Sequence, residues 1–529
     1  MPRLELKPTL SEAIAVADLG NLIPVYAEVA SDLDTPVSLF LKLAADEPSF
    51  LLESVDGGER IARYSFLGVR LREALVLRGR DLKRHTLIDG ELQTQDWKPP
   101  SEATGQPCAD VLDQLRVEMS RYKLVPTPDL PRFCGGLVGY TGYDVVRQFE
   151  QLPGTAIDVL GVPDAVYMLA DTLIAFDHAR HRLLIIANAR VESVGDSTHD
   201  QVAAVTSAYD DAAARIKTIA ARLQNAIREL RADPTAECTA TSSNKSQAEF
   251  ERMVAVAKEH VFAGDTFQIQ LSRRLTRRTT AHPFSIYRQL RRINPSPWMI
   301  YFNFGALVPQ RGPASQRTAA PLRIIAASPE LHARFEDGRA TVRPIAGTRR
   351  RGRTAEEDAA MARELMNDPK ERAEHVMLVD LGRNDIGRIA KYGTVTVPDL
   401  MVIENYSHVM HIVSSVEGEV RDGLDMFDVL RATFPAGTLS GAPKVRTMQL
   451  IEELEGERRG IYGGAAGYFS FGKQMDTCII IRTILMIGDT CYLQAAGGVV
   501  ADSVPALEYK ETANKLRACV LAIDEAELQ

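Results

Sequence analysis

Two segments of the chain each place a pair of glutamates three residues apart. Glu371 and Glu374 stand in "KERAEHVMLVDLGRND", and Glu508 and Glu511 stand in "SVPALEYKETANK". Residues three apart share one face of a helix, so each segment would present two carboxylates together if it is helical. A solvated acidic face is the ordinary explanation of such a pair. If both pairs converged in one cleft, they would instead suit Mg²⁺, which binds carboxylates, water and substrate oxygens.

Both segments carry signals for the start of a helix. Asp368 followed by Pro369 predicts an N-cap and a first helical residue, and Glu371 then falls where it would complete a capping box. In the second segment Ser503 is the candidate N-cap, and Pro505 lies in the first turn. We therefore expect two helices that start close to their acidic pairs.

Glycine-rich segments and buried polar residues could supply the rest of a site. The segments "RPIAGTRRRGRT", "FPAGTLSGAPK", "IYGGAAGYFSF" and "QAAGGVVADS" would either form tight turns or bring backbone N–H groups close to a small ligand. Arg482, in "CIIIRTILMIG", is expected on a strand, either paired with a buried carboxylate or facing an anionic ligand. His411, in a strand-like segment, is either structural or a general base. Together these features favour a small polyanionic substrate held by Mg²⁺ and Arg482.

The composition is that of an ordinary globular protein. The chain has 529 residues, of which 45% are hydrophobic and 25% charged, a size that suggests roughly two to four domains. A net charge of −8 argues against a nucleic-acid partner, and no apolar run is long enough to predict a membrane span. The start of the chain lacks the pattern of a signal peptide, and the six cysteines are scattered without a CxxC pair. These features predict free thiols and a cytoplasmic protein.

One polar segment divides the chain. Residues 198–231 are alanine-rich with apolar positions at helical spacing, and they predict a long helix. Residues 231–247 are poor in apolar side chains and rich in Thr and Ser, which predicts a linker. We therefore expect an N-terminal domain over 1–230 and a catalytic domain over 248–529.

Further local signals indicate the fold class. Ser246 and Glu249 form a candidate capping box, Asp337-Gly338 predicts a β-hairpin, and residues 308–321 are expected as a loop between two strands of another hairpin. No internal repeat is visible. Strands and helices follow one another without regular βαβ alternation, so we predict an α+β fold with antiparallel sheets.

These motifs together resemble the chorismate-utilising enzymes, most closely the anthranilate synthase component I family. The resemblance covers nearly the whole chain, from "SFLLESVDGGERIARYSFLG" and "FCGGLVGYTGYD" in the N-terminal half to "GDTFQIQLSRR", "PIAGTRRRG", "FPAGTLSGAPKVRTMQLIEELE" and the two glutamate segments in the C-terminal half. It implies two packed antiparallel β-sheets flanked by helices, with an N-terminal part for feedback and partner contacts. It also implies that chorismate and ammonia are converted to anthranilate and pyruvate, the first step of tryptophan biosynthesis.

The resemblance assigns residues to binding roles. By matching motif, Glu374 and Glu511 are the main ligands of Mg²⁺, and Glu371 and Glu508 lie close by, through water. The residues implied for chorismate binding are Gly347, Thr348, Tyr462, Arg482, Ala496, Gly497 and Gly498, with Thr438 and Lys515 nearby. The family usually has Gly-Ala-Gly where this chain has Ala496-Gly497-Gly498, so Ala496 adds a methyl group at that turn.

The resemblance also assigns the chemistry. Glu330, in "ASPE", matches the general acid that protonates the leaving C4 hydroxyl, for which it needs a raised pKa. His411 matches the histidine that removes a proton as the ring becomes aromatic. Gln268 stands where isochorismate and salicylate synthases carry a water-activating lysine, and Ala346 where aminodeoxychorismate synthases typically carry a lysine. Both positions favour ammonia as the nucleophile.

Partners and regulation complete the expectation. The chain has no nucleophile elbow that would indicate a glutaminase, so a separate glutamine amidotransferase subunit is implied, in a heterotetramer of two large and two small subunits. The residues that resemble the L-tryptophan feedback site are Glu53, Ser54, Pro297, Trp298 and Met299, with Trp298 where the family usually has tyrosine. The alternatives are an aminodeoxychorismate synthase component I and a non-catalytic chorismate- or tryptophan-binding regulator.

Overall fold

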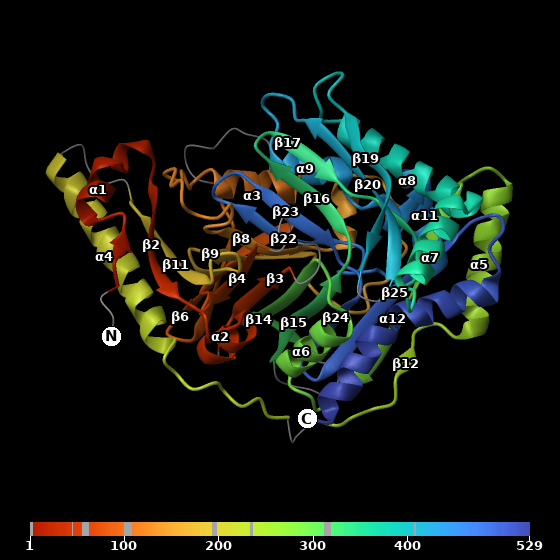
Figure 1. Ribbon diagram of the computed structural model, residues 1–529, viewed down its shortest axis with the longest axis horizontal. Helices are drawn as coiled ribbons and strands as arrows, with labels where there is room; N and C mark the ends of the chain where they lie inside the picture. Colours follow the sequence, from red (N-terminus) through yellow and green to blue (C-terminus); the bar gives the residue numbers. More distant parts are fainter. Residues whose placement is uncertain are drawn as a thin grey trace.

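Two large antiparallel sheets form the centre of the molecule (Figure 1). The computed structural model describes residues 4–529, apart from residues 45, 55–62, 100–107, 193–197, 233–235, 312–318 and 407–408. The first sheet has the order β1 (Leu6–Lys7), β2 (Leu22–Ala30), β11 (Arg182–Arg190), β10 (Thr172–Asp177), β4 (Tyr64–Val69), β3 (Ser49–Glu53), β14 (Trp298–Arg311), β15 (Ala319–Ser328), β24 (Thr483–Ile487), β25 (Thr490–Val499), β13 (Gln268–Arg278) and β12 (Ser242–Ser243), with β21 (Gly441–Ala442) beside β13.

The second sheet is of similar size. Its order is β18 (Ile345–Arg350), β20 (Val409–Glu419), β17 (Arg339–Val342), β16 (Leu331–Glu336), β23 (Met475–Ile479), β22 (Ala465–Ser470), β8 (Gly136–Thr141), β9 (Ala165–Ala170), β5 (Glu73–Arg78), β6 (Asp81–Ile88) and β7 (Glu91–Asp96), with β19 (Thr396–Asn405) beside β20. The predicted α+β class with two packed antiparallel sheets is confirmed. Each sheet contains strands from both sides of residues 231–247, so the division into domains at that segment stays a prediction.

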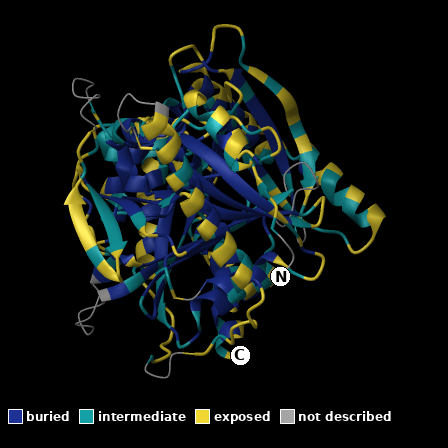
Figure 2. Ribbon diagram, turned by 90° about the vertical axis from the view of Figure 1, so that its left-hand side faces the viewer, coloured by how far each residue is buried: buried dark blue, intermediate teal, exposed yellow. Residues whose placement is uncertain are grey.

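Helices cover the outer faces of both sheets. A core of residues from both sheets, including Phe50, Tyr140, Val166 and Ile324, lies between them. The first sheet packs on α1 (Leu10–Ala15), α2 (Pro36–Leu43), α4 (Thr198–Arg222), α6 (Pro283–Ile293) and α12 (Pro505–Glu527), and the second on α3 (Val111–Met119), α8 (Pro369–Gly387) and α9 (Met426–Thr433). Figure 2 shows buried strands inside and exposed residues along the outer helices. No helix among the described residues is both long and apolar enough to cross a membrane.

The N-terminal and C-terminal halves of the chain contribute their strands to each sheet in mirror-image order. No internal repeat was visible in the sequence, so this symmetry was not predicted. In the first sheet β2, β11, β10, β4 and β3 of the N-terminal half meet β14, β15, β24, β25 and β13 in mirrored order, and β22 beside β8 is the matching centre of the second sheet. The sequence has short traces of this repeat: "GGLVGY" (135–140) against "GGAAGY" (463–468), and "DVLDQLR" (110–116) against "DMFDVLR" (425–431). The fold therefore consists of two similarly wound halves.

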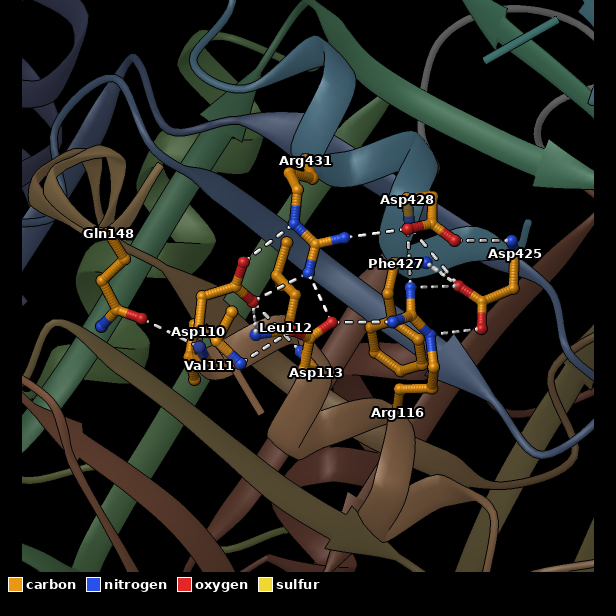
Figure 3. Close-up of polar contacts among 11 residues, drawn as sticks. Asp110, Val111, Leu112, Asp113, Arg116, Gln148, Asp425, Phe427, Asp428 and Arg431 are labelled. Carbon is orange, nitrogen blue, oxygen red and sulfur yellow. Dashed lines mark hydrogen bonds and ion pairs between the residues drawn. The ribbon is translucent and has the colours of Figure 1, made fainter. Parts of the chain in front are cut away.

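The second pair of repeated segments forms α3 and α9, which lie side by side (Figure 3). An arginine of each helix donates hydrogen bonds to an aspartate at the start of the other helix. Arg116 donates from Nε and Nη2 to Asp425, at 2.9 and 3.2 Å, and Arg431 donates in the same way to Asp110, at 2.9 and 2.8 Å. Each receiving aspartate is also the N-cap of its own helix. Two-point arginine–carboxylate pairs fix geometry, so this junction ties the two halves together.

Local predictions are confirmed where a few neighbouring residues decide them. The capping box of Ser246 and Glu249 opens α5 (Gln247–Phe262), and Asp337-Gly338 forms the β16–β17 turn with positive φ at both residues. The hairpin predicted around residues 308–321 is present as β14 and β15, but the loop is shorter than predicted, because residues 308–311 and 319–321 belong to the two strands. Residues 312–318 lie outside the described residues. All six cysteines are free. The long helix predicted over 198–231 ends at Arg222, because the residues from 224 to 229 are exposed and offer no apolar face.

Candidate active site

One cavity of about 590 Å³ collects most of the predicted site residues. Its walls come from α8, α12, β13, β18, β20 and β25, and from the segments that precede β16 and β24. Glu371 and Glu374 line it from α8, and Glu508 and Glu511 line it from α12. Two acidic pairs more than 100 residues apart in the sequence thus border the same space.

The two acidic helices start differently. The Asp368 side chain accepts from the Lys370 and Glu371 N–H groups, at 3.0 and 3.2 Å, and Pro369 is the first residue of α8, as predicted. The capping box with Glu371 is wrong, since this carboxylate accepts from Arg349 Nη1 at 3.1 Å. The prediction that Ser503 caps α12 is also wrong. Its hydroxyl accepts from the Val500 N–H at 3.0 Å and closes a turn, so the helix begins without a side-chain cap.

The four carboxylates are in different electrostatic states. Burial raises the pKa of Glu374, which accepts from Gln268 Nε2 at 2.8 Å. Glu511 forms an ion pair with Lys515 at 2.7 Å. Burial acts to raise the pKa of Glu511, but Lys515, Glu508 and Arg482 together lower it. Burial and the charge of Glu511 raise the pKa of Glu508, against the opposing effect of the Ser503 hydroxyl, and the two carboxyl groups of Glu508 and Glu511 lie close enough to share a proton.

These donors can be tested against Mg²⁺. In the described part of the chain, no three His, Cys, Asp or Glu side chains are arranged to hold a metal ion by themselves. Mg²⁺ prefers one or two carboxylates together with water and substrate oxygens, so a preformed cage is not needed. Burial and neighbouring carboxylates raise the pKa of both Glu374 and Glu508, and a cation between the two helices would offset this repulsion. The residues fit an ion that shares its coordination with a ligand.

Cationic groups face the acidic wall. Arg482 lies in the bend between β23 and β24, not on a strand as predicted, with φ of 51°. Burial lowers the pKa of its guanidinium, and it forms no ion pair within the described ranges. An arginine in the left-handed region is strained and persists only where its surroundings hold it. Of the two predicted explanations, the geometry favours an anionic ligand.

Glu330 lies in the same cavity, directly before β16. Its Oε1 accepts from Thr438 Oγ1 at 2.9 Å, and burial raises its pKa to about 8, against the opposing charges of Lys515 and Arg482. A carboxyl group with such a pKa is protonated near neutral pH. The group can therefore give a proton to a ligand in the cavity.

His411 lies on β20 and lines the same cavity. Its Nδ1 is 2.9 Å from the carbonyl oxygen of Gly347 and 3.1 Å from Thr348 Oγ1. Burial lowers the pKa of His411, so the ring is neutral. Because a carbonyl oxygen only accepts, Nδ1 carries the hydrogen and Nε2 keeps its lone pair, as a general base requires.

The predicted glycine turn is only partly in the site. Ala496 and Gly498 line the cavity, and Lys515 Nζ donates to the Ala496 carbonyl oxygen at 2.9 Å. Gly497 does not line it, and a Cβ at this residue would lie 3.2 Å from Glu508 Oε2 on α12. The remaining predicted binding residues, Gly347, Thr348, Tyr462 and Thr438, all border the cavity.

Some residues that line the cavity were not predicted. They are Gln270, Lys370 and Asn514, together with apolar residues such as Leu378 and Val500. Asn514 is three residues after Glu511, so the helical spacing that gave the acidic pair also indicates it. Gln270 shares its strand face with Gln268, two residues away.

A second cavity, of about 480 Å³, lies between the two sheets where the halves meet. All five predicted effector residues line it: Glu53, Ser54, Pro297, Trp298 and Met299. Trp298 Nε1 donates to Asp476 Oδ1 at 3.0 Å across the sheets. Glu53 accepts from Arg291 and from the Tyr287 hydroxyl, so its charge is already compensated. This cavity is separate from the one that holds Glu330.

Comparisons with known proteins agree over nearly the full length. Residues 74–520 match the chorismate binding enzymes. The chain is 45% identical to anthranilate synthase component 1 of Acetivibrio thermocellus over 98% of this chain and 99% of that protein, and 42% identical to the Pseudomonas putida protein of the same name over 98% of each. The crystal structure of anthranilate synthase component I from Streptococcus pneumoniae is similar with a TM-score of 0.70 and 32% identity, covering 93% of this chain and 98% of that one. The menaquinone-specific isochorismate synthase from Escherichia coli shares the fold, with a TM-score of 0.65 at 14% identity over 97% of this chain and 99% of that one.

Proposed function

The chain belongs to the chorismate binding enzymes, and within them to the anthranilate synthase component 1 family, and from this premise we propose that it converts chorismate and ammonia to anthranilate and pyruvate. The observation that carries the proposal is Glu330: a buried carboxyl group, protonated near neutral pH, that borders the same cavity as Arg482 and the acidic pairs. A protein that only bound chorismate would have no use for such an acid.

Substrate binding follows from the division of charge in the cavity. Arg482 provides a cation for one carboxylate of chorismate. Mg²⁺ would be held by Glu374 and Glu511, with Glu371 and Glu508 reaching it through water, and when bound it would offset the charge of the ring carboxylate. The main-chain turn at Gly347 and the ring of Tyr462 shape the space between these groups.

The first chemical step is substitution on the ring. Ammonia adds at C2, and the C4 hydroxyl departs as water after taking the proton of Glu330. Thr438 Oγ1 donates to one oxygen of this carboxyl and so fixes the direction of the other. The nitrogen that has been added loses one proton, so that the charges balance.

The second step is elimination. His411 Nε2 takes the proton from C2, the bond from C3 to the enolpyruvyl oxygen breaks, and the ring becomes aromatic. The departing enolpyruvate gains one proton on its methylene carbon and becomes pyruvate, so the proton taken from C2 is balanced. The neutral ring and its hydrogen bond to Gly347 support this role. Without the base, the amino-substituted diene would remain.

The choice of ammonia rests on two side chains. Gln268 uses its amide to hold Glu374, and an amide is too weak a base to activate water. Ala346 lines the cavity without any amine that could attack C2. Lys515 is held between Glu511 and the Ala496 carbonyl oxygen. These contacts support direct attack by ammonia and the formation of anthranilate in preference to aminodeoxychorismate.

We further propose a partner and an inhibitor. The relatives are named as component 1, which supports a glutamine amidotransferase subunit as the source of ammonia, in a heterotetramer of two subunits of each kind. The cavity between the sheets is proposed to bind L-tryptophan. The buried Ser54 hydroxyl makes no hydrogen bond to a described residue and supports a polar ligand there.

The test is product identification. Purified chain is incubated with chorismate, Mg²⁺ and an ammonium salt at pH 8.5, and anthranilate is detected by fluorescence and mass. Parallel samples contain EDTA, glutamine in place of ammonium, or L-tryptophan. We expect anthranilate with ammonium only, its loss with EDTA, and inhibition by L-tryptophan. Formation of aminodeoxychorismate, or no consumption of chorismate, would contradict the proposal.

A further inference from the structure

A small third cavity, of about 40 Å³, lies behind Glu330. It shares Glu330, Leu378 and Thr438 with the substrate cavity, so the carboxyl group borders both spaces. A water molecule needs roughly 10–15 Å³ of such space, so the cavity has room for about three. The substrate cavity is filled by the ligand during catalysis, whereas this one is not.

The cavity wall that contains Glu330 also contains a buried histidine, two residues further along the chain. His332 is the second residue of β16 and is 3% exposed. Its Nδ1 lies 3.4 Å from Thr477 Oγ1, and the ring also has the backbone of Thr433, in the same cavity wall, as a weak hydrogen-bond partner. Burial and the charge of Lys444 lower the pKa of His332 to about 3, so the ring is neutral and can both give and accept a hydrogen bond.

A charged pair closes the far end of the cavity. Asp385 lines it from α8 and is 5% exposed, and Lys444 Nζ donates to Asp385 Oδ2 at 2.7 Å. Half-buried residues of the rim, Leu381 and Gly437, separate the cavity from solvent. Gly437 has no room for a side chain, because a Cβ would lie 2.0 Å from Leu381. The cavity therefore runs from the acid past His332 to a polar end near the surface.

The proposed reaction needs a proton at this place in every turnover. Glu330 becomes a carboxylate when the C4 hydroxyl leaves as water, and it must be protonated again before the next substrate reacts. The added nitrogen releases one proton, so the total balances, but that proton is lost on the substrate side. A path from behind returns a proton to Glu330 without waiting for the product to leave.

We propose that this cavity holds a chain of water molecules through which Glu330 regains its proton, with His332 as the positioning residue that orients the chain between Glu330 and the Asp385–Lys444 pair. The inference rests on the proposed role of Glu330 as the acid. No metal or cofactor takes part. Each oxygen–hydrogen bond formed along the chain, the last of them on Glu330, is matched by one broken on the water that donates. One proton enters from solvent at the Asp385–Lys444 end for each proton delivered, so no hydroxide is left in the cavity.

The experiment compares His332→Leu with His332→Gln, using free ammonium and saturating Mg²⁺. His332→Leu keeps the size and removes both hydrogen-bonding nitrogens, while His332→Gln keeps a donor and an acceptor. We expect His332→Leu to lower kcat by about tenfold to a hundredfold, somewhat less than the roughly 10²–10⁴-fold effect of losing a general acid. KM for chorismate should stay within twofold, and the solvent deuterium isotope effect on kcat should rise because proton return becomes rate-limiting. His332→Gln should recover most of kcat.

Glu330→Gln, measured in parallel, tests the role of Glu330 as the acid separately from the water chain. If Glu330→Gln is inactive while His332→Leu keeps both kcat and the isotope effect of the unmodified enzyme, the water chain is refuted and the proposed function stands. If Glu330→Gln remains active, the acid role itself is refuted, and the water chain with it. Should His332→Leu fail to fold, Asp385→Asn carries the same test, since it keeps the contact with Lys444 and removes the charge. A raised isotope effect in Asp385→Asn supports the inference, and an unchanged one refutes it.

Discussion

Glutamine in place of Glu330 should change how the stability of this protein depends on pH. Burial raises the pKa of Glu330 from 4.5 to about 8, so the folded state keeps a proton that the unfolded chain gives up. Stability from this group is fully present below pH 4.5 and is lost as the pH rises through 8. Glu330→Gln has nearly the same shape and does not titrate, and Thr438, Lys515 and Arg482 face this position in both proteins.

The size of the effect follows from the shift. Raising the pKa from 4.5 to about 8 corresponds to at most about 5 kcal/mol, at roughly 1.36 kcal/mol per pKa unit. For a chain of 529 residues the entropy of unfolding is about 1.1 kcal/mol/K, so 5 kcal/mol corresponds to about 4 °C in Tm. The two proteins should melt together at pH 5, and Glu330→Gln should melt up to about 4 °C higher at pH 9. The same variant should lose about 10²–10⁴-fold in kcat.

Differential scanning calorimetry of both proteins at pH 5 and pH 9, with EDTA and without chorismate, measures this difference. Every other titrating group is common to the two proteins, so only the change in their Tm difference between the two pH values matters. The order of melting at one pH alone carries no weight. A Tm difference that is equal at pH 5 and pH 9 would show that Glu330 is ionised in the folded protein, and the general-acid role would be lost with it.

Four further results are expected. Glu374→Gln should lower kcat at least tenfold and raise the Mg²⁺ concentration needed for half-maximal activity, and an unchanged Mg²⁺ titration would remove Glu374 from the metal site. His411→Gln should accumulate the amino-substituted diene, seen by mass spectrometry, whereas anthranilate formed at the original rate would exclude His411 as the base. Trp298→Ala should weaken inhibition by L-tryptophan at least tenfold with kcat unchanged, and equal inhibition would place the effector elsewhere. Arg116→Met should lower the free energy of unfolding by about 1–3 kcal/mol by breaking its pair with Asp425, and this loss should shrink in 1 M NaCl; a loss independent of salt would mean that apolar packing, not charge, holds the junction.

Short-range signals in the sequence predicted local structure well. Asp368 before Pro369, Ser246 before Glu249, and Asp337-Gly338 each decide their geometry within a few residues, through one or two hydrogen bonds or a preferred φ. Where a competing contact lies elsewhere in the chain, the same reasoning failed. The Glu371 carboxylate accepts a hydrogen bond from Arg349 of β18, and this long-range contact replaces the hydrogen bond that a capping box would have made.

The meeting of the acidic helices depends on long-range pairing. Spacing alone put each glutamate pair on one helix face, but the shared cavity of α8 and α12 requires that β13, β25 and β20 take their places in two different sheets. Helical or strand periodicity carries no information on that order. The resemblance to known enzymes supplied that order. The resemblance could not predict a role for His332, because this residue lies two positions after Glu330 and belongs to none of the matched motifs.

The two similarly wound halves are not equivalent in charge. Arg482 precedes β24, and its counterpart before β10 in the N-terminal half is Asp171, which pairs with Arg215 of α4 at 3.2 Å. In the N-terminal half the charge before β10 is therefore compensated by a helix residue, whereas Arg482 forms no ion pair with a described residue. The charges at this position therefore balance within the N-terminal half, while the C-terminal half leaves one buried cation for which only a ligand can provide the counter-charge.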